Sequence, residues 1–295
     1  MRVMVFGADG FIGRNVKEEL STNHIVGSAT RSGGSGGNEF QVNLLDVNTI
    51  EKALSEFHPD ALVNCAGVVG SNDDVTLNQI FTENILKTIV EMGLVLDIII
   101  IAGSAAEYGD VESLPVPETA PLSPTTAYGV AKVNETRLAL EYKAKHKLPI
   151  TIARIFNPIG ADMHEKFLIP QLIKQVAEVI KGSREFIEIS RLDSRRDYVS
   201  IKDVAIAMRT ILEAKPETPV YNVGSGVSTS NEELVAIIIK HSKMTKVPDV
   251  RESSTIPEKQ VASRADIRLI QTELGWEPKQ TLEETVKEVI YATRR

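Results

Sequence analysis

Tyr128 and Lys132 are the side chains whose types and spacing point most directly to chemistry. They stand four positions apart in a Tyr-Gly-Val-Ala-Lys segment, which places both on one face if the segment is helical. A phenol transfers protons poorly at neutral pH unless a cation within about 4–6 Å favours its phenolate form. Ser104 ends an apolar run and would offer a hydroxyl to a substrate oxygen beside Tyr128. The pattern predicts an acid–base site in which Lys132 tunes Tyr128.

A glycine-rich turn near the start of the sequence could hold a phosphate. Its three glycines, spaced three apart, lie between an apolar run and a helical pattern. The first permits a tight turn, the second lets a pyrophosphate approach the backbone, and the third allows close helix–strand packing. The following helix would present unpaired N–H groups to the phosphates. The turn predicts a dinucleotide site whose residues are Gly7, Asp9, Gly10, Phe11, Ile12 and Gly13.

The residues after the second apolar run indicate which dinucleotide binds. An NAD site usually carries Asp or Glu there for the ribose 2′-hydroxyl, whereas an NADP site offers Arg to the 2′-phosphate. This sequence has Thr30, Arg31 and Ser32 at that place and no acid. We therefore predict NADP as the cofactor, with NAD as the alternative.

Composition excludes several classes of protein. The 295 residues include 33 Lys and Arg against 40 Asp and Glu, a net charge of −7, whereas nucleic-acid binders usually show a basic field. A single cysteine, Cys65, forms neither a disulfide framework nor a Cys-rich zinc site. No apolar run approaches the ~20 residues that span a bilayer, and the first residues lack a signal-peptide pattern. We expect a cytoplasmic protein with no metal, membrane or nucleic-acid partner.

Short apolar runs alternate with helical patterns through the first half of the sequence. Runs without polar alternation suit strands that are buried on both faces of a parallel sheet. The predicted fold class is therefore α/β, a doubly wound parallel sheet. The Gly- and Ser-rich residues 31–38 are expected to form a mobile loop. Strands are expected over Arg2–Phe6, Ile25–Ala29, Ala61–Asn64, Leu94–Ala102 and Pro149–Ile155, and helices over Phe11–Leu20, Thr49–Phe57, Leu77–Met92 and Ala127–His146.

The regular alternation of apolar runs and helical patterns ends after about Pro158. We predict a dinucleotide-binding unit over residues 1–157 and a smaller, mainly substrate-binding α/β lobe over residues 158–295. Residues near 195–225 are segments that could return to the first unit. Helices are expected over Leu168–Lys181, Lys202–Ala214, Asn231–Ser242 and Leu282–Ala292, and strands near Phe186–Ile189 and Arg196–Val199.

Seven motifs occur in order over nearly the whole sequence. They are G-A-D-G-F-I-G, G-S-A-A-E-Y-G, Y-G-V-A-K, R-I-F-N-P-I-G, R-R-D-Y-V, Y-N-V-G-S-G and L-G-W-E-P. Together they resemble the extended short-chain dehydrogenase/reductases that act on nucleotide sugars, the NAD-dependent epimerase/dehydratase family. The resemblance implies a Rossmann-type fold and a hydride that moves between nicotinamide and a sugar carbon. It also implies Tyr128 as acid/base, Lys132 as its pKa modifier and ribose ligand, and Ser104 as the hydroxyl partner.

The resemblance assigns further residues to the two ligands. On the cofactor side, Cys65 is interpreted as a small packing residue beside the nicotinamide ribose rather than a nucleophile. Asn84 matches an asparagine of the family or is a plain polar helix position. The additional cofactor residues are Asn43, Leu44, Cys65, Ala66, Gly67 and Phe156, and the substrate residues are Ser104, Ala105, Ala106, Asn157 and Arg196.

Two positions differ from the patterns of some family members, one in a catalytic acid and one in a phosphate contact. Family members that carry out 4,6-dehydration need an extra acid where this sequence has Ala106, and Glu107, one position on, should face differently. Relatives also carry an Arg-Pro pair for a phosphate where this sequence has Ile256 and Pro257. The candidates to replace that arginine are Arg251, Lys259 and Arg264.

The sequence favours a reductase. The motifs from Phe156 and Arg195 are most similar to those of reductases of GDP-4-keto-6-deoxyhexoses, which implies NADPH-dependent reduction of the C4 ketone of an NDP-4-keto-6-deoxyhexose. One alternative is a nucleotide-sugar 4-epimerase with tightly bound NAD. The other is a non-catalytic NADP-binding regulator or scaffold. By analogy with the family, a homodimer is expected through the helices at residues 77–92 and 127–146.

Overall fold

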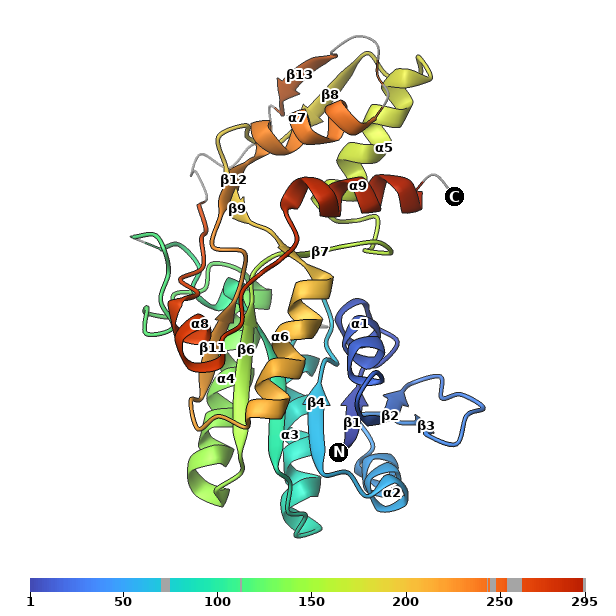
Figure 1. Cartoon of the computed structure of the whole chain (residues 1–295), viewed down its shortest axis with the longest axis vertical. Coiled ribbons are helices and arrows are strands. Elements are labelled where there is room, and N and C mark those ends of the chain that lie inside the picture. Colours follow the sequence, from blue (N-terminus) through green and yellow to red (C-terminus); the bar gives the residue numbers. More distant parts are fainter. Residues whose placement is uncertain (70–74, 112, 243, 245–247, 254–261, 294–295) are drawn as a thin grey trace.

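A parallel sheet of seven strands forms the centre of the larger unit (Figure 1). The structure, a computed structural model, describes residues 1–69, 75–111, 113–242, 244, 248–253 and 262–293. The strand order is β11-β6-β5-β4-β1-β2-β3, which confirms the predicted doubly wound α/β fold. The strands are β1 (Arg2–Phe6), β2 (Ile25–Thr30), β3 (Glu39–Gln41), β4 (Ala61–Asn64), β5 (Ile98–Ser104), β6 (Ile150–Ile155) and β11 (Val220–Val223).

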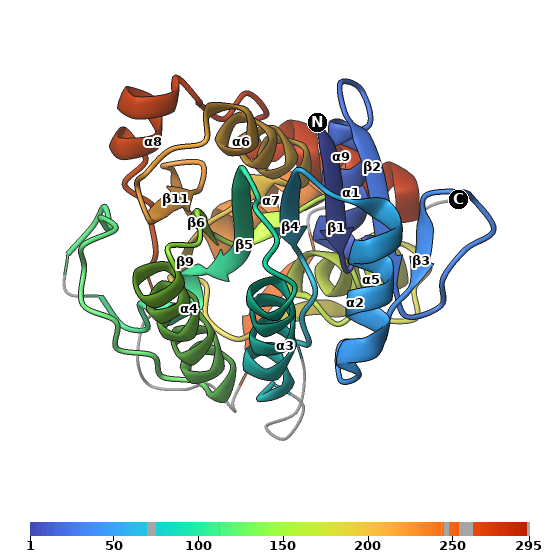
Figure 2. The same ribbon diagram turned by 90° about the horizontal axis from the view of Figure 1, so that it is seen from below.

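Helices cover both faces of this sheet (Figure 2). Every residue of β4 and β6 is buried, which explains why these runs show no polar alternation. One face packs against α1 (Phe11–Leu20), α6 (Ile201–Ala214) and α8 (Arg268–Leu274). The other face packs against α2 (Val47–Phe57), α3 (Leu77–Glu91) and α4 (Ala127–His146). Among the described residues, no helix is both long and apolar enough to cross a membrane.

A smaller unit lies beyond the carboxyl ends of the parallel strands, at the top of Figure 1. It has its own hydrophobic cluster, separate from those of the main sheet. Its elements are α5 (Leu168–Ile180), α7 (Asn231–His241), α9 (Leu282–Thr293), β8 (Phe186–Ile189) and β13 (Asp249–Glu252). Short pairs lead to it from the sheet: β7 (Pro158–Ile159) with β10 (Val199–Ser200), and β9 (Arg195–Asp197) with β12 (Ser228–Ser230).

The chain returns from the smaller unit to the main sheet before its last elements. β11 pairs with β6 in parallel, and α6 packs beside α1. Buried Asp197 holds this crossing together, since its carboxylate accepts hydrogen bonds from the N–H groups of Ser225 at 2.7 Å and Ala265 at 2.9 Å. These contacts place the ends of β6 and β9 at the same edge as the ends of β1, β4 and β5.

Two strand predictions need correction. The strand expected over Leu94–Ala102 is wrong at its start, because β5 begins at Ile98 and Val95 is 94% exposed. The strand expected over Arg196–Val199 is two strands, β9 and β10, which pair with different partners on either side of Tyr198. In both places apolar composition suggested a continuous strand, whereas the available backbone partners determine where pairing begins and ends.

Candidate active site

The turn between β1 and α1 depends on two of its glycines for its shape. Gly7 has a φ of +72°, and a Cβ there would lie 2.7 Å from the backbone of Ala66. A Cβ at Gly13 would overlap the carbonyl oxygen of Gly7. The constraint at Gly13 therefore comes from the turn's own carbonyl, rather than from the general helix–strand packing that the sequence suggests.

The first turn of α1 leaves backbone donors open beside these glycines. Gly10 is the N-cap and supplies no side chain to accept a hydrogen bond. The first N–H that bonds back to the cap is that of Arg14, at 2.9 Å from the Gly10 oxygen. The N–H groups of residues 11–13 have no hydrogen-bond partner within the described chain. Such a helix end suits the pyrophosphate of a dinucleotide, so the predicted cofactor fits this turn.

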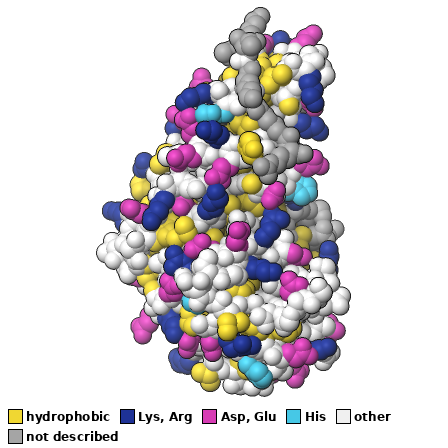
Figure 3. Space-filling model, turned by 45° about the vertical axis from the view of Figure 1, so that its right-hand side comes forward, with side chains coloured by type: hydrophobic (Ala, Val, Ile, Leu, Met, Phe, Trp, Pro, Cys, Tyr) yellow, Lys and Arg dark blue, Asp and Glu magenta, His cyan; other side chains and the backbone are white. Residues whose placement is uncertain are grey.

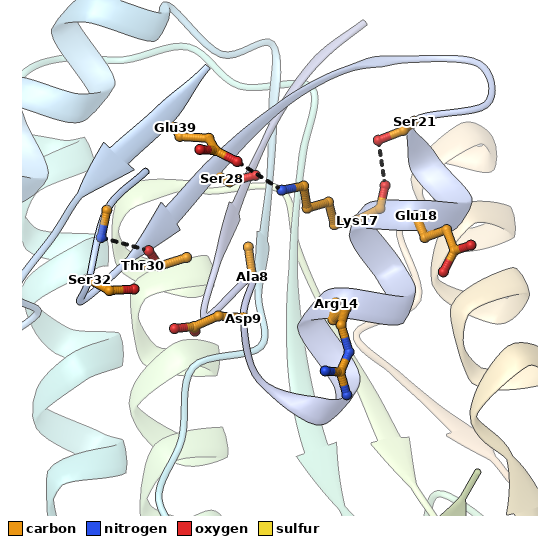
Figure 4. Close-up of a pocket in the computed structure, with 11 residues that line it drawn as sticks. Ala8, Asp9, Arg14, Lys17, Glu18, Ser21, Ser28, Thr30, Ser32 and Glu39 are labelled. Carbon is orange, nitrogen blue, oxygen red and sulfur yellow. Dashed lines mark hydrogen bonds and ion pairs between the residues drawn. The ribbon is translucent and has the colours of Figure 1, made fainter. Parts of the chain in front are cut away.

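A cavity of about 530 Å³ opens between α1 and the end of β2 (Figure 4). Asp9 lies on the same side of this cavity as Thr30 and Ser32 in the close-up. The hydroxyl of Thr30 accepts a hydrogen bond from the N–H of Gly33 at 3.0 Å, so it shapes the loop after β2. The cavity thus continues from the glycine turn to the place where a dinucleotide of this type puts its adenosine ribose.

The cations near this cavity differ in their position. Arg31, directly after β2, is exposed and forms no ion pair with other described residues, but it is not among the residues that line the cavity, whereas its neighbours Thr30 and Ser32 are. Arg14 and Lys17, on α1, line the cavity, and Lys17 forms an ion pair with Glu39 at 3.5 Å. The sequence reasoning missed these two. Their three-residue spacing on one face of the helix is the signal that could have found them.

Two of the predicted cofactor residues, Asn43 and Leu44, are held by local hydrogen bonds. The side-chain oxygen of Asn43 accepts from the N–H of Leu45 at 3.1 Å. The amide of Asn84 donates to the carbonyl oxygen of Leu44 at 2.7 Å, so Asn84 fixes the loop after β3 from the neighbouring helix. Asn43 and Leu44 therefore lie where β3 ends, at the same sheet edge as the glycine turn.

The residues after β4 lie between the glycine turn and Lys132. The N–H of Ala66 donates to the side chain of Asn64 at 3.0 Å, and the following Gly67 is exposed. Burial raises the pKa of the Cys65 thiol to about 12, against the opposing effect of Lys132. A thiol in that state is a poor nucleophile, which supports the interpretation of Cys65 as a packing residue.

Ser104 ends β5 and begins a single 3-10 turn, η1 (Ala105–Glu107). Its hydroxyl oxygen accepts from the N–H of Ala106 at 3.2 Å, and its own N–H donates to Glu107 Oε1 at 2.9 Å. This reciprocal arrangement is a capping box. The serine is therefore held by the backbone that follows it, with Ala105 and Ala106 half-buried beside it.

The side chain of Glu107 lies in the protein interior. It is fully buried, and its Oε2 forms an ion pair with Arg154 at 2.9 Å and accepts from the hydroxyl of Thr136 at 3.0 Å. Arg154 in turn donates to the hydroxyl of Tyr108 at 2.8 Å. With its oxygens used in this way, Glu107 serves the packing of η1 on β6 and α4 and does not supply an acid beside Ser104 and Tyr128.

The start of α4 packs directly on η1. Thr126 caps the helix by accepting from the N–H of Gly129 at 3.0 Å. A Cβ at Gly129 would lie 2.5 Å from the carbonyl oxygen of Ala106, so only glycine permits this approach. Tyr128, the residue before it, is half-buried. The close approach brings Tyr128 and Ser104 to the same end of the sheet.

Lys132 lies one turn further along α4 and is 5% exposed. Its ammonium donates to the carbonyl oxygen of Ala102 at 2.6 Å and also to Glu135. Burial opposes its charge, but Glu135 and Tyr128 outweigh that effect and hold the pKa of Lys132 above its ordinary value. The amine therefore remains a cation beside Tyr128, as the acid–base prediction requires.

The predicted substrate-binding side chains differ in hydrogen bonding and burial. Asn157 donates to the carbonyl oxygen of Asp197 at 2.8 Å, while Arg196 on β9 is half-buried. Phe156, which was predicted on the cofactor side, has a side chain that is 1% exposed and packs with Tyr108, so this side chain is a packing group.

The candidates for the second phosphate contact are not all described. Residues 256, 257 and 259 lie outside the described part of the chain. Arg251 pairs with Asp249 at 2.7 Å on β13. The Nε of Arg264 is buried without a hydrogen-bond partner, which leaves Arg264 the stronger of the two described candidates.

Comparison with known proteins identifies the family. The sequence profile of the NAD dependent epimerase/dehydratase family matches residues 3–224. The chain belongs to this family. It is thus an enzyme of the extended short-chain dehydrogenase/reductase type, as the motifs predict, and the matched residues include the glycine turn, Ser104, Tyr128 and Lys132.

Individual members of the family show the range of activities that similar chains carry. The GDP-6-deoxy-D-mannose reductase of Pseudomonas aeruginosa is 24% identical, with 98% of this chain and 96% of that protein covered. UDP-glucose 4-epimerase 2 of Arabidopsis thaliana is 26% identical, with 97% and 93% covered. The solved structure of RMD from Pseudomonas aeruginosa complexed with NADPH has a TM-score of 0.86 at 22% identity, with 100% and 98% covered.

One acidic residue of this epimerase/dehydratase site escaped the sequence reasoning. Glu135 stands three positions after Lys132 and lies against its ammonium. The signal was available, since residues three apart on a helix are neighbours. A Lys–Glu pair at this spacing is also typical of an exposed helix face, so the sequence did not reveal that the Glu135 carboxylate is buried.

Proposed function

We propose that this protein is an NADPH-dependent reductase of the C4 ketone of an NDP-4-keto-6-deoxyhexose. The observation that carries the proposal is the packing of η1, which follows Ser104, against the start of α4, which holds Tyr128 and the charged Lys132. The open end of α1 follows β1 of the same parallel sheet. A proton donor with a neighbouring cation, a hydroxyl and a dinucleotide turn are together what carbonyl reduction needs.

The chain's own residues supply the proton and the orientation. The dinucleotide, when bound, supplies the hydride for the ketone carbon. Tyr128 gives its proton to the developing alkoxide, and the hydroxyl of Ser104 hydrogen-bonds the same oxygen. Lys132 holds a positive charge beside Tyr128 and so stabilises the phenolate that remains. The first turn of α1 and the glycine turn would hold the pyrophosphate.

A dehydratase is disfavoured by the residues around Ser104. Ala106 carries no proton to donate, and the carboxylate of Glu107 is fully buried in its contacts with Arg154 and Thr136. An additional acid is therefore lacking at the place where the family's 4,6-dehydratases use one.

The end of β2 supports NADP over NAD. Arg31 has no ion-pair partner within the described residues, and a free guanidinium suits a 2′-phosphate. A reductase exchanges its cofactor in each turnover, which suits this open cavity. Among similar proteins, the solved RMD structure is described as complexed with NADPH.

The substrate class rests on Arg196 and on the named relatives. Arg196 lies on β9 at the edge where the smaller unit meets the sheet, and a guanidinium there suits a diphosphate. The relatives named as acting on GDP-6-deoxy-D-mannose and UDP-glucose are nucleotide-sugar enzymes. The base of the nucleotide is left open by these observations.

A nucleotide-sugar 4-epimerase is the second candidate, because the same three residues serve it and a relative carries that name. Such an enzyme retains NAD and returns the hydride. The purified protein should therefore be analysed for bound dinucleotide, then incubated with NADPH and a panel of GDP-, UDP- and dTDP-4-keto-6-deoxyhexoses. Oxidation of NADPH with one of them supports the reductase. Stoichiometric NAD in the purified protein and isomerisation without added reductant would establish the epimerase instead.

A further inference from the structure

Glu135 is a buried carboxylate to which the proposed chemistry assigns no task. It is 1% exposed on α4, and one of its oxygens accepts a hydrogen bond from the ammonium of Lys132. The other oxygen accepts from the hydroxyl of Thr82, on α3, at 2.7 Å. A buried charge is costly unless it is paired and hydrogen-bonded, and here both conditions are met by partners from two helices.

The hydrogen bonds continue from Thr82 to the cofactor side of the sheet. The side-chain amide of Asn64 donates to the Thr82 hydroxyl at 2.9 Å. The oxygen of the same amide accepts from the N–H of Ala66 at 3.0 Å. Glu135 is therefore held by a series of buried groups that runs from α4 through α3 to the end of β4, where the dinucleotide cleft begins.

The ammonium of Lys132 is correspondingly fixed before any ligand binds. One N–H points to the carbonyl oxygen of Ala102 and a second to Glu135. An ammonium group has three donors in a fixed tetrahedral arrangement. With two donors committed, the direction of the third is set, and it has no partner among the described residues.

We propose that Glu135 is a positioning residue that keeps Lys132 charged in its buried place and directs its remaining N–H to the cofactor. The proposal deepens the proposed function, because it rests on Tyr128 and Lys132 forming the acid–base pair. It adds a carboxylate, three residues after the lysine, to the groups that determine how this site responds to pH.

Among the charges around Lys132, that of Glu135 contributes most to keeping the ammonium protonated. From α4 the facing groups are Tyr128 and Glu135, and from η1 it is Glu107. Glu107 is already paired with Arg154. The described neighbour from α3 is the neutral hydroxyl of Thr82. Removing the Glu135 charge would leave burial, which lowers the pKa of Lys132, opposed mainly by Tyr128.

After β4, the facing titratable group is Cys65. The pKa of its thiol is raised by burial to about 12, so it carries no charge that could replace that of Glu135. With the carboxylate gone, the ammonium would lose its proton at a lower pH than in the wild type. The alkaline decline of cofactor binding, which depends on the Lys132 charge, would therefore move toward lower pH.

The test compares Glu135→Gln, Glu135→Asp and the wild type. Glutamine keeps the shape and the acceptor oxygen without the charge, whereas aspartate keeps the charge. The affinity for NADPH, and separately for NADH, is measured by fluorescence titration from pH 6 to pH 10. In Glu135→Gln we expect the alkaline loss of affinity to begin at least about one pH unit lower, with affinity near that of the wild type at pH 6. Glu135→Asp should restore most of the wild-type profile.

Glu141→Gln is the matched control, since Glu141 is an exposed carboxylate on the same helix, and its profile should follow the wild type. Thr82→Val provides a second variant that leaves Glu135 in place, and it should give a smaller shift in the same direction. A folded Glu135→Gln protein whose binding profile superimposes on that of the wild type would overturn the proposal. Because cofactor binding is read without a sugar, absence of turnover on every sugar would count against the proposed reaction and not against Glu135.

Discussion

The hydroxyl of Tyr128 has no hydrogen-bond partner among the described residues, whereas Lys132, one helical turn away, has two. This contrast separates their tasks. Tyr128 is free to meet a ligand oxygen, and Lys132 is held in place to provide charge. A residue with no internal partner also contributes little to stability, so substitution at Tyr128 can separate chemistry from folding.

Tyr128→Phe should lower turnover on the correct substrate by at least ~10²-fold, because the proton donor is lost. Its free energy of unfolding should stay within about 0.5 kcal/mol of that of the wild type, since no internal hydrogen bond is removed. Steady-state kinetics and urea unfolding measure the two quantities. Near-normal turnover in this variant would contradict the assigned mechanism.

Arg31→Ala tests the choice of cofactor. Loss of a charge-assisted contact to the 2′-phosphate should weaken NADPH binding by about tenfold to a hundredfold, with NADH affected much less. Arg14→Ala is the comparison, because Arg14 on α1 lines the cavity whereas Arg31 is not among its lining residues. If Arg14→Ala weakened NADPH binding and Arg31→Ala did not, the 2′-phosphate contact would belong to α1 and not to the end of β2.

At the scale of elements, the site depends on how η1 and α4 fit together. Gly129 permits the helix to approach the carbonyl of Ala106, and the Glu107–Arg154 ion pair holds η1 to β6 from beneath. That pair is buried, with side-chain exposures of 0% and 3%. Ser104 is thereby positioned by groups that never meet a ligand.

Glu107→Ala should lower the free energy of unfolding by about 3–5 kcal/mol, because it leaves the Arg154 charge buried without its partner. Glu91→Ala is the matched control, since Glu91 forms an exposed ion pair with Lys87 at 3.7 Å on α3. That surface pair should contribute at most about 0.5 kcal/mol. Urea unfolding of both variants gives the comparison, and equal effects would show that burial does not govern the pair's contribution.

At the scale of the whole molecule, charge is dispersed. Acidic and basic side chains alternate over the face shown in Figure 3, without a continuous field of either sign. A net charge of −7 is compatible with polyphosphate ligands, because their charge would be met locally by the end of α1, Arg31 and Arg196. A local arrangement of this kind does not require a basic protein.

The outer faces of α3 and α4 form the surface through which we expect two chains to associate. These helices pack side by side on one face of the sheet, and they expose Ile80 at 40% and Val130 at 46%. We expect a homodimer through these helices, with a mass in solution twice the 32.3 kDa of one chain. Ile80→Glu combined with Val130→Glu should yield the monomer in sedimentation equilibrium. Val95→Glu, at a 94% exposed loop position, should not, and a monomeric wild type would contradict the expectation.

The sequence by itself determined the alternation of strands and helices, the glycine turn and the Tyr128–Lys132 pair. These features depend on local backbone preference and on the period of apolar residues, both of which are readable along the chain. Helices such as Phe11–Leu20 and Ala127–His146 have the predicted bounds for this reason. Short strands such as β3 and β13 were not predicted. β3 has only the three residues Glu39–Gln41, too few to show a period, and β13 pairs with β8, which is distant in the sequence.

Only the tertiary structure decided which charges meet. Glu107 lies against Arg154, 47 positions away, and Glu135 shares its carboxylate between Lys132 and Thr82, 53 positions away. Helical spacing places Glu135 beside Lys132, but no periodicity encodes the contacts with Arg154 and Thr82 or the burial of these carboxylates, because both depend on the packing of whole elements. The sequence thus indicated that Tyr128 and Lys132 do the chemistry, while the packing of α4 against α3 and η1 determined which carboxylate holds the lysine charged.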